Sequence, residues 1–339
     1  MARRDIVVIG ASAGGIEALG LLVRQLPPEL GAAVFVVLHL APDHKSVLPR
    51  ILSAAGPLPA KHAVDGEAVV PNRIYVARPD HHMVIQDSHV RVIRGPRENG
   101  HRPAIDPLFR SAAYTFGPRV IGVVLSGSLD DGTAGLVSIK HQGGLALVQD
   151  PNEAMVDSMP RSALENVDID HVLPAAELGK LLPSLVSQTV DDAPPARSAM
   201  ELESVLQVNG SIEATLKVGA PSALACPDCG GVLNEVREGD LLRFRCRVGH
   251  AYAPETLYVE QRAALEGALW AALRALEEQA ALARRMAARA RTLKQARSAA
   301  HFDERADAAG AQAETVRAAL HLGAPPATDP RDRDREAGT

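Results

Sequence analysis

The stretch DIVVIGASAGGIEAL, from Asp5 to Leu19, decides how the rest of the chain is interpreted. A short run of β-branched residues meets a turn of small residues. The apolar residues then recur at the three-to-four spacing of a helix. This order predicts a strand, a tight turn and a helix, which is the first unit of an α/β sheet. A single hydroxyl, that of Ser12, lies among the glycines and alanines of the turn.

Three interpretations of this turn compete. A dinucleotide-binding turn has glycines at its first, third and sixth places, and here the third place is Ser12. The second interpretation is a G-x-S-x-G turn of Gly10, Ser12 and Gly14, which presents a nucleophile at the carboxyl edge of a sheet. The third is a plain strand-to-helix turn with an incidental serine. The turn alone does not decide between the last two.

Residues 4 to about 190 alternate β-branched runs with helical patterns, which predicts a doubly wound, mostly parallel sheet. Within this region, residues 73–93 contain three strand patterns with no helix between them, so we expect a small antiparallel excursion there. The other expected strands are 5–10, 33–40, 119–127, 144–150 and 170–175, and the expected helices are 14–26, 45–56, 106–117, 131–144 and 175–188.

A serine hydroxyl needs a base, and the base needs an orienting carboxylate. His39 follows the second strand as Ser12 follows the first, so the two ends lie at one edge of the sheet. Asp130 and Asp131 lie in a turn after a third strand, where either is also a candidate helix N-cap. Other histidines compete with His39 for the role of base, namely His44, His62, His81 and His82.

The motifs IGASAGG (9–15), VLHL (37–40) and VVLSGSLDDGTAG (123–135) together resemble the catalytic domain of CheB-type chemotaxis protein-glutamate methylesterases. Supporting matches are RIYVARPDHHMVI, RPAIDPLFRSAA and DSMPRSALE, and the resemblance covers about residues 4–188. It implies that Ser12 is the nucleophile, His39 the base and Asp131 the orienting acid. It also implies that the backbone amides of Ala13 and Ser128 stabilise the oxyanion.

Three departures from the family pattern stand out. Ala13 replaces the threonine that often follows the nucleophile, and Ser128-Leu129 replaces a Met-Gly pair in the glycine turn. Because backbone amides, not side chains, are expected to bind the oxyanion, we expect these side-chain changes to be tolerated. The Cβ of Leu129 nevertheless restricts the φ and ψ angles that the turn can adopt. The strand pattern also starts at Asp5, so we expect the protein to lack the phosphoreceiver domain that usually precedes this domain in the family.

The resemblance implies hydrolysis of glutamate methyl esters on chemoreceptor-like proteins, through an acyl-enzyme, to glutamate and methanol. Some relatives also deamidate receptor glutamines. A different class of function is a non-catalytic signalling adaptor that keeps the fold for binding. A nucleotide-binding domain is a third interpretation, which Ser12 at the place of a glycine disfavours. No cofactor is expected for catalysis.

The three cysteines of the chain all lie between Cys226 and Cys246. Cys226 and Cys229 form a C-x-x-C pair, and Cys246 and His250 form a C-x-x-x-H pair. Three thiolates and one imidazole make a closed set for structural zinc, joined by a hairpin around REGD as in a zinc ribbon. A redox C-x-x-C pair and free buried thiols are the alternatives. An open catalytic zinc is disfavoured because four good ligands leave no vacant position.

The remaining sequence sets the expected organisation. We expect the catalytic domain at 1–190, a linker at 191–200, a zinc-ribbon-like module at 201–253, a helical region at 254–322 and a disordered tail at 323–339. Two apolar stripes predict a helical hairpin that packs on itself, makes a homo-oligomer or docks a partner. The first stripe is Leu265, Leu269, Leu273, Leu276, Ala280, Ala283, Met286 and Leu293; the second is Phe302, Ala306, Ala309, Ala313, Val316 and Leu320.

Composition sets the class of protein. The 339 residues carry a formal net charge of −5 and only 3% aromatic residues, which gives no electrostatic reason to expect nucleic acid as a partner. No apolar run approaches the length that spans a bilayer, and the apolar run of MARRDIVVIG is too short for a signal peptide. We therefore expect a cytoplasmic protein without membrane insertion.

Overall fold

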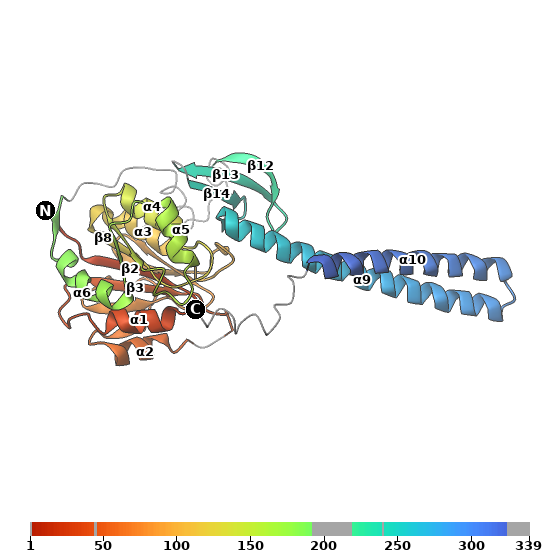
Figure 1. Ribbon diagram of the computed structural model, residues 1–339, viewed down its shortest axis with the longest axis horizontal. Coiled ribbons are helices and arrows are strands. Elements are labelled where there is room, and N and C mark those ends of the chain that lie inside the picture. The colour runs from red at the N-terminus through yellow and green to blue at the C-terminus, as the bar shows by residue number, and fades with distance from the viewer. Residues whose placement is uncertain (1, 44–45, 192–218, 239–240, 324–339) are drawn as a thin grey trace, which may run out of the picture. The chain divides into compact units, whose positions relative to one another are not determined.

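The computed structural model describes residues 2–43, 46–191, 219–238 and 241–323 (Figure 1). These residues form two compact units, of which the first ends at Tyr258 and the second begins at Val259. The expected linker from residue 192 onward, the expected ribbon module before residue 219 and the expected tail from residue 324 lie outside the described residues.

A seven-stranded parallel sheet forms the centre of the first unit, in the order β10-β9-β8-β2-β3-β5-β4. From β2 the chain runs outward to β3 in one direction, and β8 begins the run in the other. The order therefore reverses between β2 and β8, and ligand sites of doubly wound folds lie at such a reversal. The strands are β2 (Ile6–Ala11), β3 (Ala33–Leu38), β4 (Ala60–His62), β5 (Arg73–Val76), β8 (Val120–Val124), β9 (Leu145–Gln149) and β10 (His171–Leu173).

Helices cover both faces of the sheet, so the expected doubly wound α/β fold is confirmed (Figure 1). Along β2, Val7 and Ile9 pack on the face covered by α1, α2 and α6, while Ile6 and Val8 pack against α3, α4 and α5. This alternation is the period of two of a strand buried on both faces. The helices are α1 (Gly15–Val23), α2 (Leu48–Ala55), α3 (Ile105–Phe116), α4 (Thr133–His141), α5 (Ser158–Asn166) and α6 (Ala175–Val186).

The expectation of a three-stranded antiparallel excursion is wrong for its first strand. β5 pairs in parallel with β3 and β4, and only β6 (His82–Gln86) and β7 (His89–Ile93) form an antiparallel pair. The physical reason lies in burial, because Ile74, Tyr75 and Val76 are all buried, as in a central strand covered on both faces. Short elements absent from the expectation include β4, α5, the 3-10 helix Gly117–Arg119 and the antiparallel pair of β1 (Ala2–Arg3) with β11 (Thr189–Val190).

The cysteine-containing segment folds as a four-stranded antiparallel sheet, here called the ribbon, in the order β12-β13-β14-β15. Its strands are β12 (Ala220–Ala225), β13 (Val232–Glu238), β14 (Leu241–Cys246) and β15 (Ala251–Tyr252). The expected hairpin is formed by β13 and β14, with Leu233 opposite Cys246. A small core holds the ribbon together and consists of Cys226, Leu233, Phe244, Cys246, Tyr252 and Leu257.

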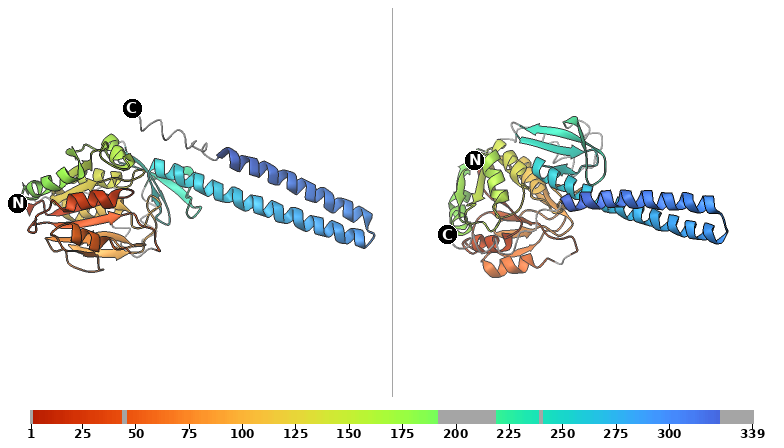
Figure 2. Two further views of the ribbon diagram at one scale, coloured as in Figure 1. Left: turned by 60° about the horizontal axis from the view of Figure 1, so that its bottom comes forward. Right: turned by 45° about the vertical axis from the view of Figure 1, so that its right-hand side comes forward.

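The last described segment is a hairpin of α9 (Pro254–Thr292) and α10 (Ala296–Gly323), which run side by side in both views of Figure 2. Alanines rather than leucines fill most of its seam, which is made by Leu273, Ala280, Ala283, Ala287, Ala290, Ala299, Ala306, Ala309 and Ala313. The expected first stripe is therefore wrong at Leu265, Met286 and Leu293, which are 60%, 41% and 57% exposed. Small residues let two helices approach closely, and the larger side chains then point outward. None of the helices in the described ranges is long and apolar enough to cross a bilayer.

Candidate active site

The turn that carries Ser12 is built from backbone contacts that only small residues allow. Ser12 lies between β2 and α1, and its N–H donates to the carbonyl oxygen of Ser126 at 2.9 Å. Gly14 has φ +74°, and a Cβ there would lie 2.6 Å from the Cβ of Met155. The glycine is therefore required by both conformation and space.

The side chain of His39 bridges Ser12 and Asp131. Its Nδ1 lies 3.1 Å from the Oγ of Ser12, and its Nε2 lies 2.8 Å from the Oδ2 of Asp131. His39 is 5% exposed and Asp131 is 2% exposed, so water screens this pair weakly. When Nε2 carries the proton and donates it to the carboxylate, Nδ1 is free to accept the Ser12 hydroxyl proton. The structure thus joins the three predicted residues in one hydrogen-bonded chain.

The competing histidines take other positions. His62 and His81 contact the backbone oxygens of Ser46 and Pro79. His82 is fully buried, with its Nε2 at 2.8 Å from the carbonyl oxygen of Pro96 and its Nδ1 accepting from the backbone N–H of Ala104. None of these three contacts Ser12 in the described part of the chain, and His44 lies outside the described residues.

Four donors fix the carboxylate of Asp131. Its Oδ2 accepts from the backbone N–H of Ile105 at 2.6 Å as well as from His39, and its Oδ1 accepts from Asn99 Nδ2 at 2.9 Å and from the backbone N–H of Asp106 at 3.2 Å. Burial alone raises the pKa of this carboxyl. The hydrogen bond and charge of His39, with the other donors, outweigh burial and hold the pKa below its usual range. Asp131 is therefore an ionised acceptor.

The side chains of Asp130 and Asp131 point in different directions, which distinguishes their roles. The Oδ1 of Asp130 accepts from the Thr256 hydroxyl at 2.6 Å, away from the histidine. Burial raises the pKa of Asp130 to about 7. Of the two adjacent aspartates, only Asp131 contacts His39 in the described structure.

The two loops with the expected oxyanion donors are tied together beside the nucleophile. The Ser126 hydroxyl donates to the carbonyl oxygen of Ala13 at 2.7 Å. The backbone of Gly127 lies so close to Ser12 that a Cβ on Gly127 would be 2.8 Å from the Cβ of Ser12. Among the described residues, neither the Ala13 amide nor the Ser128 amide donates to a protein acceptor. Leu129 has φ +63°, so this non-glycine residue adopts the left-handed conformation of the turn.

Sequence reasoning missed three residues that surround the triad. Asn99 and Asp106 hold Asp131 and the glycine turn, since Asp106 Oδ1 also accepts from the backbone N–H groups of Gly132 and Gly135 at 3.1 and 2.7 Å. His101 stacks on the His39 ring with centroids 3.7 Å apart and an angle of 15°. Burial lowers the pKa of His101 to about 4, so a neutral ring covers His39. The sequence carried no periodic signal for these loop positions.

A cavity of about 370 Å³ opens above Ser12 and His39. Its polar lining includes Asp80, Arg97, His101 and Arg102, and the rest is Leu40, Ala41, Pro42 and Gly100. Arg102 pairs with Asp80 through its Nε at 2.8 Å, whereas the Arg97 side chain is exposed. A cleft of this kind admits a side chain presented by another molecule and offers a cation near the nucleophile.

The predicted metal-ligating residues also come together. The Sγ atoms of Cys229 and Cys246 lie 3.7 Å apart, and His250 Nδ1 lies 3.7 Å from the Sγ of Cys226 and 3.5 Å from that of Cys246. All four ligand atoms lie within 4.8 Å of one another. With Zn–S bonds of about 2.3 Å and Zn–N bonds of about 2.0 Å, a tetrahedral zinc site has edges of about 3.8 Å between sulfurs and about 3.5 Å from sulfur to nitrogen. The donor set and its spacing fit such an ion.

Comparison with known proteins assigns the N-terminal region, which contains the Ser12 site, to a family. The family model described as CheB methylesterase matches residues 7–182. A protein of Leptospira interrogans is 38% identical over 178 residues, which are 52% of this chain and 92% of the relative. A relative from Anaeromyxobacter dehalogenans, named protein-glutamate methylesterase/protein-glutamine glutaminase 2, is 38% identical over 184 residues.

These matches differ in how much of each protein they cover. The Anaeromyxobacter match covers 54% of this chain and 54% of the relative, so this chain spans about half the length of that protein. The crystal structure of the Thermotoga maritima CheB methylesterase catalytic domain matches with a TM-score of 0.52 and 34% identity, over 54% of this chain and 98% of that one. By its family match, its relatives and its fold, the chain belongs to the CheB methylesterase family.

Proposed function

We propose that this protein is a protein-glutamate methylesterase that hydrolyses glutamate methyl esters through a serine acyl-enzyme. The observation that carries the proposal is the hydrogen-bonded chain from Ser12 through His39 to Asp131. Its position at the reversal of strand order, beneath an open cleft, supports the same conclusion. Membership in the CheB methylesterase family supports the choice of ester.

The first step is acylation. His39 Nδ1 takes the proton of Ser12 as its oxygen attacks the ester carbonyl, and the imidazolium that forms is stabilised by Asp131 through Nε2. The amides of Ala13 and Ser128 stabilise the tetrahedral oxyanion, where each donor contributes about 3 kcal/mol to the barrier reduction. His39 then protonates the departing methanol.

The second step is hydrolysis of the acyl-enzyme. Water enters the position that methanol left and attacks the acyl carbonyl carbon as His39 takes its proton. The bond from that carbon to the Ser12 oxygen then breaks, and His39 returns the proton to restore the Ser12 hydroxyl. The product carries a new carboxylate. Exposed Arg97 on the cleft wall attracts this negatively charged group.

The proposed substrate is a methylated chemoreceptor or a similar signalling protein. The same acyl-enzyme also forms from a glutamine side chain, with ammonia in place of methanol as the leaving group. The names of the relatives include protein-glutamine glutaminase, which favours testing this second substrate. Neither reaction requires a cofactor at the Ser12 site.

We also propose that Cys226, Cys229, Cys246 and His250 hold a structural zinc ion. Two tight turns support this role, because Gly230 N–H donates to the carbonyl oxygen of Cys226 at 2.8 Å and Gly249 N–H donates to that of Cys246 at 2.9 Å. The ion supplies a cross-link between the halves of a ribbon whose own core is small. Four protein ligands leave no open position for substrate.

Methanol release tests the proposed reaction. The full chain is incubated with a receptor fragment that carries methyl-esterified glutamates, and methanol is quantified for the wild type and for Ser12→Ala. Ser184→Ala is the matched control, because Ser184 lies exposed on α6, where its hydroxyl donates to Leu181. We expect release by the wild type and the control only. Receptor binding without methanol release would instead favour the adaptor function.

A further inference from the structure

A single loop, Arg97–His101, connects the ribbon to the Ser12 site. Asn99 on this loop donates to Asp131, and His101 on the same loop stacks on His39. The loop is closed by reciprocal backbone hydrogen bonds between Glu98 and His101, at 3.2 and 2.9 Å. Any element that holds this loop therefore also holds the geometry of the triad.

The ribbon and the residue that follows it hold Asn99 through two hydrogen bonds. The backbone N–H of Asn99 donates to the carbonyl oxygen of Ala251 at 2.8 Å, and its Oδ1 accepts from the backbone N–H of Ala253 at 2.9 Å. Because Oδ1 is fixed by Ala253, the Nδ2 group is directed toward Asp131 and Asp106, at 2.9 and 3.1 Å. The ribbon thus selects the orientation of the Asn99 amide.

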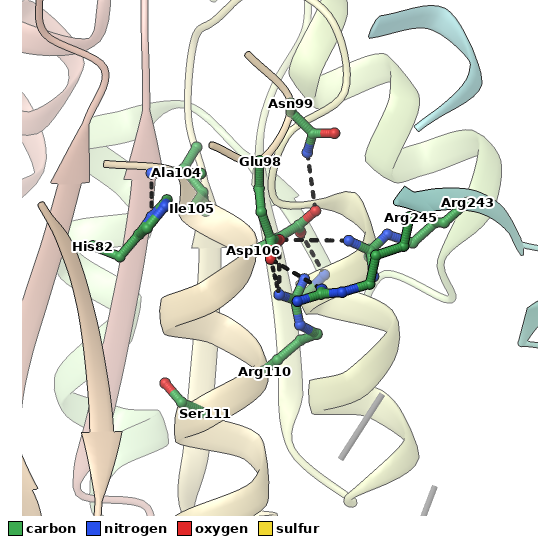
Figure 3. A network of polar contacts seen from close by, with 12 residues as sticks. His82, Glu98, Asn99, Ala104, Ile105, Asp106, Arg110, Ser111, Arg243 and Arg245 are labelled. Carbon is green, nitrogen blue, oxygen red and sulfur yellow. Dashed lines mark hydrogen bonds and ion pairs between the residues drawn. The ribbon is translucent and has the colours of Figure 1, made fainter. Parts of the chain in front are cut away.

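Glu98 provides a second connection, which Figure 3 shows from close by. Its fully buried carboxylate accepts two hydrogen bonds from Arg110 of α3, at 2.9 and 2.7 Å. From β14, Arg245 and Arg243 reach the same carboxylate at 3.3 and 3.5 Å. A buried carboxylate is costly without cationic partners, so two ribbon arginines stabilise Glu98 where it adjoins Asn99.

The residues of the cysteine–histidine cluster adjoin these contacts in the chain. Its member His250 immediately precedes Ala251, and Cys246 is the next residue after Arg245. The family match ends at residue 182, before the ribbon begins. The ribbon therefore lies outside the matched family domain in sequence. It nevertheless contacts residues that surround the Ser12 site of that domain.

We propose that the metal-loaded ribbon is a positioning element for the triad, with Asn99 as the positioning residue that connects the two. Loss of the ion loosens His250 and β15, which frees Asn99 to turn away from Asp131. The carboxylate then loses one of its four donors, and His39 loses its fixed position relative to Ser12. Esterase activity is thereby made dependent on metal supply. This inference rests on the proposed serine mechanism.

The test measures the reactivity of Ser12 rather than turnover of a receptor. The rate of labelling by a fluorophosphonate is measured on the full zinc-loaded chain, after zinc removal by a chelator, and after zinc is added back. The same series is run on Asn99→Ala, Arg245→Met and Arg237→Met. Arg237 is the matched control, because it lies on β13 with its side chain 69% exposed and contacts only Glu235 among the described residues. The downfield proton resonance of His39 Nε2–H, bonded to Asp131, is recorded in parallel.

We expect zinc removal to slow labelling by about 10–100-fold and to broaden the His39 resonance, with both restored when zinc returns. Asn99→Ala slows labelling to a similar degree with zinc bound. Zinc removal then adds little, since the two changes break the same connection. We expect Arg245→Met to slow the labelling rate and Arg237→Met to be labelled at the wild-type rate.

Three contrary results are possible, and they overturn different parts of the proposal. If the zinc-loaded wild type is not labelled at Ser12, the proposed serine mechanism fails. If Ser12 is labelled, but at the same rate in zinc-loaded Asn99→Ala and with an unchanged His39 resonance, the positioning role is overturned while the mechanism stands. Additive effects of Asn99→Ala and zinc removal would also overturn the connection between them. The Asn99 comparison uses zinc-loaded protein, so it remains decisive even if the chelated ribbon unfolds.

Discussion

Replacing Asp131 by asparagine tests the acid of the triad by changing one atom. Each carboxylate oxygen accepts two hydrogen bonds, Oδ2 from His39 and Ile105, and Oδ1 from Asn99 and Asp106. An asparagine has one acceptor oxygen and one NH₂ group. In either orientation its NH₂ group faces two N–H donors, so no rotation of the side chain satisfies the site.

The magnitude follows from that count. When the NH₂ group faces Asn99 and Asp106, two buried donors lose their acceptors at about 1–3 kcal/mol each, so stability falls by at least about 2 kcal/mol and Tm by about 4 °C or more. When it faces His39, a change of ring tautomer satisfies that contact and only the Ile105 N–H loses its acceptor, so the lower bound is about 1 kcal/mol. If the NH₂ group faces His39, the ring must take the tautomer that cannot accept the Ser12 proton. The equivalent change in a serine protease lowers kcat by about 10⁴-fold.

The assay compares Asp131→Asn with Asp130→Asn at pH 7. The control is matched because Asp130 accepts from Thr256 through one oxygen, which an asparagine amide oxygen replaces. We expect methanol release to fall by about 10³–10⁴-fold in Asp131→Asn and to stay within a few-fold in Asp130→Asn. An Asp131→Asn enzyme with more than about a tenth of wild-type activity would refute the assigned role. Equal losses in the two variants would refute it as well.

Three further predictions concern the turn after β8. Gly127→Ala places a Cβ 2.8 Å from that of Ser12, so labelling by a fluorophosphonate falls strongly; a wild-type rate would contradict the close approach. Leu129→Gly keeps methanol release within a few-fold, because glycine adopts a φ of +63° freely; a large loss would implicate the side chain. Burial raises the pKa of Asp130 to about 7, so wild-type stability in urea falls between about pH 4 and 7 at up to about 1.4 kcal/mol per pH unit. In Asp130→Asn, the free energy of unfolding falls less steeply over this pH range. Identical curves of stability against pH for the two proteins would contradict the raised pKa.

The sign of the pH effect follows from proton binding. A carboxyl with a raised pKa binds its proton more tightly in the folded state than in the unfolded chain. Stability is therefore greatest where both states are protonated and falls as the unfolded state alone ionises. Asp106 has its pKa raised to about 6, chiefly by burial and by the neighbouring Asp131, so it contributes in the same direction. The difference between the wild type and Asp130→Asn isolates the contribution of Asp130.

The sheet could be predicted because its strands carry their own signal. The run from Ile6 to Ala11 is apolar throughout and ends at a small-residue turn, which fixes both a strand and its edge. His39 and Asp131 follow strand ends in the same way, so adjacency in a parallel sheet suggested their meeting. The strand Arg73–Val76 was wrongly predicted to be antiparallel because no helix follows it. Only its burial on both faces shows that it belongs to the parallel sheet.

The residues that support the site carried no such pattern. Asn99 and His101 lie in an irregular loop, where neither hydrophobic periodicity nor motif spacing assigns a partner. Their contacts come from segments far along the chain, since Asn99 is 154 positions from Ala253 in sequence. The pairing of Glu98 with Arg243 and Arg245 is likewise tertiary. The first hairpin stripe was wrong at Met286 and Leu293 for another reason, because the small residues Ala287 and Ala290 line the seam there and the larger side chains point outward.

Peptide mapping of a fluorophosphonate adduct shows whether Ser12 is a nucleophile and whether His39 makes it one. The full zinc-loaded chain and its His39→Ala variant are labelled, digested and analysed by mass spectrometry. We predict one adduct on Ser12 in the wild type and a labelling rate lower by at least about 10²-fold in His39→Ala. An adduct on another residue, or equal rates on Ser12 in the two proteins, would contradict the account.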